Sequence, residues 1–134
     1  EKDLRDVYHL LSRLESDAAG VVARNATDAQ LQTLQALHDE LAACIDDREK
    51  FFAVNERFHL QLLALADNRW RDQMVTDLRK VMKLNRHNSL LKQGRIEDSL
   101  QEHRRLMQAL CTHDAEATRQ AMQDHFHQGL EAAT

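Results

Sequence analysis

The chain has 134 residues, with 18 Lys and Arg against 22 Asp and Glu, and its formal net charge is −4. That length favours a single domain, and interspersed charges of both signs do not indicate a nucleic-acid-binding surface by themselves. No apolar run approaches the ~20 residues of a membrane span, and the first residues lack the pattern of a secretory signal. With no proline and three glycines, the composition favours an all-α domain. We expect a cytoplasmic protein in which Cys44 and Cys111 are small, reduced core residues.

Apolar residues at three- and four-residue spacing predict six helices. The predicted spans, in chain order, are residues 2–26, 28 to about 45, 47 to about 66, 69 to about 91, 95–113, and 115 onward. Short connections between successive helices imply antiparallel neighbours, and hence a six-helix bundle.

Short polar residues mark most of the predicted helix boundaries. The expected N-caps and breaks are Thr27 in a capping box with Gln30, a second capping pattern at Asp46–Glu49, Asn68, the helix breaker Gly94, and Asp114.

Polar residues occupy the middle of three predicted inward faces. Asn55 and His59 lie on the apolar face of the third predicted helix, His103 on that of the fifth, and His125 on that of the sixth. Burying these groups costs free energy unless each finds a partner. A divalent metal ion would satisfy all four, because imidazole suits several transition metals and a side-chain oxygen can complete the set. The alternative is a metal-free bundle in which the histidines hydrogen-bond one another.

The remaining histidines serve as controls for this pattern. His127 is two residues past His125 and therefore points away from its face. We expect the others to be solvated, because they fall on polar faces or near helix ends; they are His9, His38, His87 and His113.

Several stretches resemble a known family. "NERFHLQLLALADN", "SLQEHRRLMQAL" and "HDAEATRQAMQDHF" are similar to the C-terminal ligand-sensing (FCD) domain of FadR-type regulators in the GntR superfamily. The likeness covers essentially the whole chain, and the count of six helices suits the VanR-like subgroup. It implies one effector-binding and dimerisation domain over residues 1–134. The winged helix-turn-helix domain that binds DNA in such regulators is not visible in this chain.

The resemblance also implies a site. In the family, a metal ion lies beside a pocket for a small organic acid, and the matching positions here are Asn55, His59, His103 and His125. Zinc or nickel is the expected metal, with iron and manganese as alternatives. A homodimer is expected by analogy, with Trp70, Phe126 and Leu91 available for a partner surface.

The chain departs from the family pattern at two positions. The oxygen donor is more often aspartate, and the neutral Asn55 leaves more of the metal's charge for an anionic ligand. Leu11 stands where the family often has an arginine that points into the pocket. Arg79 and Arg86 are the candidates to replace that arginine at the effector site, although a solvated basic face is the alternative for both.

An enzyme is the competing hypothesis. Glu56 and His59 form a Glu-x-x-His, but di-iron bundles need that motif on two helices. Glu102 and Asp124 directly precede histidines, so they should diverge from them by about 100° and provide no general base. We therefore expect no catalytic residues.

Overall fold

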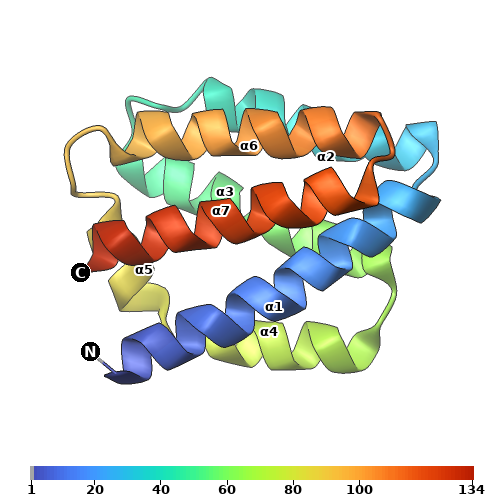
Figure 1. Cartoon of the computed structure of the whole chain (residues 1–134). Coiled ribbons are helices and arrows are strands. Elements are labelled where there is room, and N and C mark those ends of the chain that lie inside the picture. Colours follow the sequence, from blue (N-terminus) through green and yellow to red (C-terminus); the bar gives the residue numbers. More distant parts are fainter. Residues whose placement is uncertain (1) are drawn as a thin grey trace.

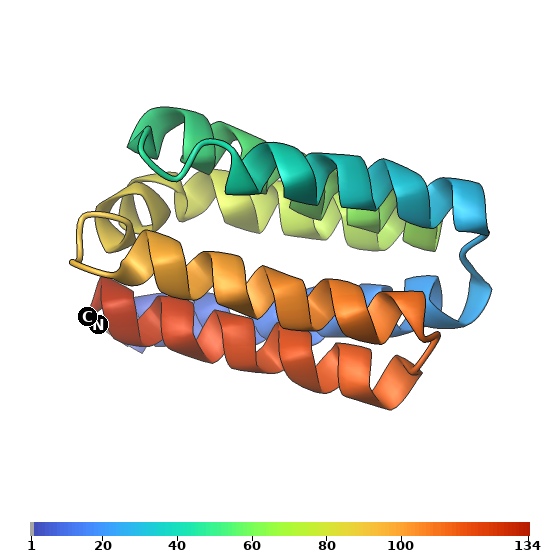
Figure 2. The same ribbon diagram turned by 90° about the horizontal axis from the view of Figure 1, so that it is seen from above.

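The computed structural model describes residues 2–134, which form an all-α bundle of seven helices (Figure 1). The helices are α1 (Lys2–Asn25), α2 (Asp28–Ala42), α3 (Arg48–Ala66), α4 (Arg69–Val81), α5 (Lys83–Ser89), α6 (Arg95–Cys111) and α7 (Ala115–Ala133). Helix α7 packs along α1 on one side and along α6 on the other. Both termini lie at the same end of the bundle (Figure 2). Within the described residues, no helix is long and apolar enough to cross a bilayer.

The helix starts follow the predicted capping chemistry, with one shift. Thr27 and Gln30 form the reciprocal capping box, with backbone-to-side-chain distances of 3.0 and 3.2 Å. Asn68 and Asp114 cap α4 and α7 as predicted. The cap of α3 is Asp47, which accepts a hydrogen bond from the Lys50 amide at 3.1 Å, so the helix begins one residue later than the Asp46–Glu49 pattern implies. Gly94 ends the preceding segment with φ 81°, a conformation that glycine adopts without steric cost.

The prediction of one long fourth helix was wrong. The segment is divided at Met82 into α4 and the seven-residue α5, which is why the described residues form seven helices rather than six. In a continuous helix the Arg79 carbonyl would accept the amide of Lys83. Here it accepts a hydrogen bond at 2.8 Å from the Arg86 guanidinium. This side-chain contact supports the break, where no glycine or proline is present.

Two other expectations about burial were wrong. Cys44 is buried, but Cys111 is exposed and is not a core residue. Phe126 is only 6% exposed and packs edge-on against Tyr8, so it is unavailable to a partner. Trp70 and Leu91 are exposed, as expected.

Candidate metal centre

Three histidines from three helices meet in the middle of the bundle. His59 on α3, His103 on α6 and His125 on α7 each offer a ring nitrogen, and these nitrogens all lie within 4.8 Å of one another. Their ring centroids are between 4.8 and 5.4 Å apart. Zn–N bonds of about 2.0–2.1 Å place two nitrogens of one ion at most about 4 Å apart, so small ring rotations bring these atoms to bonding positions. We call these three residues the histidine cluster.

Two glutamates, the buried Glu15 and the half-buried Glu102, fix the orientation of the His59 and His125 rings. Glu15 on α1 lies 2.8 Å from Nδ1 of His59, and Glu102 on α6 lies 2.5 Å from Nδ1 of His125. An ionised carboxylate only accepts, so Nδ1 donates in both pairs. That tautomer leaves Nε2 of each ring with a free lone pair. Carboxylates behind histidines are the usual arrangement around protein-bound metals.

Three ring nitrogens of the histidine cluster have no hydrogen-bond partner among the described residues. Nε2 of His59 and both ring nitrogens of His103 are buried and unpaired. Buried polar groups are nearly always satisfied, because leaving one unpaired costs roughly 1–3 kcal/mol. The histidine cluster therefore fits a divalent cation, which would accept lone pairs from all three rings.

The surroundings of His59 and His103 keep these two rings neutral. Burial, reinforced by the charge of Arg79, lowers the pKa of His59 to about 4. Burial, together with the charge of His125, lowers the pKa of His103 well below its usual value. Burial opposes ionisation of Glu15, but Arg79 and His59 outweigh it and hold the pKa of that carboxyl at about 2. At neutral pH, His59 and His103 are thus uncharged, the form of imidazole that coordinates metal.

Asn55 lies where the sequence places it, one helical turn before His59. Its Oδ1 is buried without a hydrogen-bond partner in the described chain. Asn55, His59 and His125 all line a cavity of about 50 Å³. The fourth ligand remains a prediction, but an unpaired amide oxygen beside two of the three rings agrees with it.

The predicted effector residues have different environments. Arg79 is 4% exposed, which excludes the solvated alternative for it. It donates twice to Glu15, at 2.8 and 2.9 Å, and once to Glu56 at 2.7 Å. Arg86 forms an ion pair with Glu56, and both arginines line the cavity. Leu11 is completely buried in the hydrophobic core and is not among the residues that line the cavity, so its role toward an effector stays a prediction.

Sequence reasoning missed several residues of the site. The expectation that Glu102 points away from the histidines was wrong, because its carboxylate contacts His125 and is held by two hydrogen bonds from Arg95, at 2.7 and 2.9 Å. These bonds overcome the effect of burial and lower the pKa of Glu102. The expectation that His38 is solvated was also wrong, since it is 6% exposed and its ring lies 6.5 Å from that of His103. Tyr8 and Arg95 line the cavity as well.

Without a metal ion, the charges of the arginine and glutamate side chains around the cavity sum to zero. Three arginines and three glutamates form ion pairs next to the histidine cluster. Arg79 and Arg86 pair with Glu15 and Glu56, and Arg95 pairs separately with Glu102. A divalent cation adds two positive charges to this neutral set. The cavity would then attract an anion.

Comparison with known proteins identifies relatives across the chain. The sequence model of the FCD domain matches residues 6–128. The chain is 25% identical over 134 residues to the uncharacterized HTH-type transcriptional regulator YdhC of Bacillus subtilis strain 168, covering 97% of this chain and 59% of YdhC. It thus spans about three fifths of that relative's length.

Solved structures share the fold. The chain superposes on E. coli McbR/YncC with a TM-score of 0.91 at 20% identity, covering 99% of this chain and 68% of that one. It superposes on Streptococcus agalactiae GntR with a TM-score of 0.83 at 25% identity, covering 96% of this chain and 58% of that one. The bundle described above is therefore an arrangement already seen in solved structures of bacterial proteins.

Proposed function

We propose, from the premise that this chain belongs to the FCD domains of GntR-type transcriptional regulators, that it senses a small organic acid beside a divalent metal ion. As a regulatory domain of this family it is not an enzyme. YdhC is named an HTH-type transcriptional regulator. By analogy, the parent of this chain binds DNA through a separate helix-turn-helix domain, in the cytoplasm, and effector binding here alters that activity.

The observation that carries the proposal is the unpaired, carboxylate-backed histidine cluster inside a charge-neutral set of ion pairs. The metal ligands are His59, His103 and His125, with Asn55 as the oxygen donor. A bound cation would supply a fixed positive charge and an open coordination position. The chain supplies neutral imidazoles, a dry environment and the arginines that surround an incoming carboxylate.

Zinc or nickel suits a donor set of three imidazoles and one amide oxygen, with iron and manganese as alternatives. Elemental analysis of the purified chain by mass spectrometry tests the site. We expect about one metal ion per chain, and a fall in melting temperature after chelation, because metal binds the folded state preferentially. No co-purifying metal, together with a melting temperature that ignores both chelator and added metal, would favour the metal-free bundle.

Arg79 and Arg86 are the proposed effector contacts, because both line the cavity beside the histidine cluster. An effector carboxylate would meet a cation and a guanidinium, an arrangement that favours bidentate recognition of an acid. Melting-temperature measurements with a panel of organic acids, with and without metal, test this step. Shifts that appear only with metal present support it.

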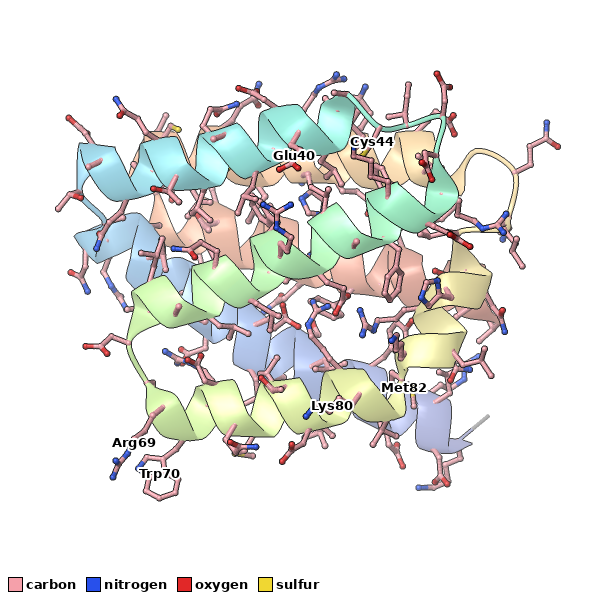
Figure 3. The ribbon with its side chains drawn as sticks, turned by 180° about the vertical axis from the view of Figure 1, so that it is seen from behind. Glu40, Cys44, Arg69, Trp70, Lys80 and Met82 are labelled. Atoms are coloured by element: carbon pink, nitrogen blue, oxygen red, sulfur yellow. The ribbon has the colours of Figure 1, made fainter. Side chains whose placement is uncertain are left out.

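A homodimer is part of the proposal. Helix α4 carries exposed apolar side chains at positions that share one face, namely Trp70, Met74 and Val81. Trp70 projects away from the bundle at the start of α4 (Figure 3). Exposed apolar residues that gather on one face mark interaction surfaces, and a second copy of the chain is the partner that the family resemblance implies.

A further inference from the structure

A second hollow adjoins the histidine cavity. A groove of about 620 Å³ lies between α3, α4 and α5, on the side of the molecule shown in Figure 3. Phe52, Arg79 and Arg86 line both the groove and the 50 Å³ cavity. The two hollows therefore adjoin at these three residues.

The inner cavity is too small for a whole effector. One water needs roughly 10–15 Å³ of such space, whereas ligand pockets typically measure about 300–1,000 Å³. At about 50 Å³ the inner cavity accommodates a few waters or a head group, and the groove of about 620 Å³ accommodates a ligand body.

The partition between the hollows consists of side chains that can rotate. The Arg86 guanidinium lies 5.3 Å from the ring centre of Phe52, and the Phe52 ring stacks on His87 at 3.5 Å. Arg86 extends from the short helix α5 and reaches the Arg79 carbonyl and Glu56. A rotation of Arg86 joins the groove to the cavity without any movement of the helices that carry the histidines.

The groove has unbalanced positive charge. Arg48, Lys80 and Lys83 line it, and none of the three pairs with an acidic residue within residues 2–134. Two carboxylates, Glu49 and Glu56, line the groove. Glu56 is already neutralised by its ion pairs with Arg79 and Arg86, which leaves Glu49 as the one acidic residue of the described lining that faces the three basic residues. The positive excess therefore lies away from the histidine cluster, at the α4–α5 side of the groove.

We infer that the effector is an elongated acid with an anionic group at each end. Its head carboxylate occupies the histidine cavity, its apolar body lies along Phe52, Leu60 and Leu91, and its distal anion pairs with Lys80 and Lys83. This inference rests on the proposed function, since the head group requires the metal. It adds a second anion site, at Lys80 and Lys83, that selects for ligand length.

Calorimetric titration of the metal-loaded chain with straight dicarboxylic acids, from succinate to sebacate, tests the inference. Monocarboxylic acids of the same chain lengths are the matched ligands. We expect a dicarboxylate of intermediate or greater length to bind about two- to fivefold more tightly than its monocarboxylate, because Lys80 and Lys83 are exposed and an exposed ion pair is worth at most about 1 kcal/mol. We expect the doubly substituted variant K80Q/K83Q to lose that advantage.

The control variant is K92Q, since Lys92 is exposed in the α5–α6 connection and does not line the groove. It should retain the preference for dicarboxylates. Equal binding of mono- and dicarboxylates, an unchanged preference in K80Q/K83Q, or no binding by any acid of the series overturns the inference. Sedimentation of K80Q/K83Q completes the test, because loss of a dimer in this variant would show that a second copy of the chain covers the groove.

The metal content separates this inference from the proposed function. If the chain holds about one metal ion and binds short acids without regard to length, the proposed function stands and the second anion site is wrong. If no metal binds, the proposed function itself fails.

Discussion

Replacing Glu15 with glutamine should weaken metal binding and destabilise the fold at the same time. Glu15 is completely buried, contacts Nδ1 of His59 at 2.8 Å and accepts two hydrogen bonds from Arg79. The glutamine keeps the shape and one acceptor oxygen but removes the charge. Partners behind ligating histidines typically contribute 10–100-fold to metal affinity, so we expect E15Q to bind metal roughly 10–100-fold more weakly than the unmodified chain.

The effect on stability follows from the pKa of Glu15. The folded state lowers it from 4.5 to about 2, which corresponds to roughly 3 kcal/mol in favour of the folded state at neutral pH. E15Q loses that contribution and leaves Arg79 with Glu56 alone, so we expect the metal-free variant to lose about 3 kcal/mol of unfolding free energy. Urea denaturation of the chelator-treated proteins measures this difference.

The variant E56Q is the matched control. Glu56 also accepts a hydrogen bond from Arg79, but among the described residues it bonds to no member of the histidine cluster. E56Q should therefore keep its metal affinity while losing some stability. Competition with a chromogenic chelator measures both affinities. If E15Q binds metal as tightly as E56Q and the unmodified chain, Glu15 does not support the metal ligands and our interpretation of the site is refuted.

Three further results are expected. H103A should abolish stoichiometric metal binding, measured by elemental analysis, whereas H127A should not, because His127 is exposed and outside the cluster; a full metal complement in H103A would contradict the assignment. The metal-free chain should lose unfolding free energy as pH falls, first between about 6.5 and 4, because His59 takes up a proton in the unfolded state that the folded state resists. A second loss should follow from about 4.5 to 2, as Glu15 is protonated. Urea denaturation in buffers of decreasing pH measures both losses, and a free energy of unfolding that is flat across this range would contradict both pKa shifts. W70E should shift the sedimentation coefficient from dimer to monomer without changing the metal content, and a variant that remains dimeric would exclude the exposed face of α4 as the interface.

The sequence predicted the histidine cluster because its members stand out within their own helices. His59, His103 and His125 each interrupt an apolar face with a period of 3.6 residues, which is a local pattern. The caps Thr27, Asn68 and Asp114 are equally local, and the structure confirms them.

The partners of the histidines were harder to predict because they are set by tertiary packing. On α1, Tyr8 and Glu15 are buried together with the apolar residues Leu4, Leu11 and Ala18. Glu15 follows Leu11 by four residues and shares its buried face. The argument that identified Asn55, a polar residue within an apolar face, therefore applies to Glu15 as well. The break at Met82 had no local cause in the sequence, since the Arg86 side chain supports it from the next helix.

Helix α4 connects the cavity to the proposed dimer surface. Arg79 extends from α4 into the ion pairs behind His59, while Trp70 and Met74 are exposed on another side of the same helix. A helix of this length moves as a unit because its backbone hydrogen bonds are internal. We propose that an effector carboxylate that competes with Glu15 for Arg79 displaces α4, and with it the exposed apolar face.

The break at Met82 separates α4 from α5, while α4 stays packed against α1 and α3. Because α4 ends there, it can shift relative to α5 without moving α6, which carries His103. In this proposal α4 has two positions, one with and one without the effector. The effector shifts the balance between them, and so the geometry of the dimer, only by the difference in its affinity for the two positions. Arg79 and Arg86 meet at the break and both line the cavity, so an acid bound there interacts differently with the two positions. The arginines proposed to recognise the effector are thus also the residues through which its binding would reach a partner subunit.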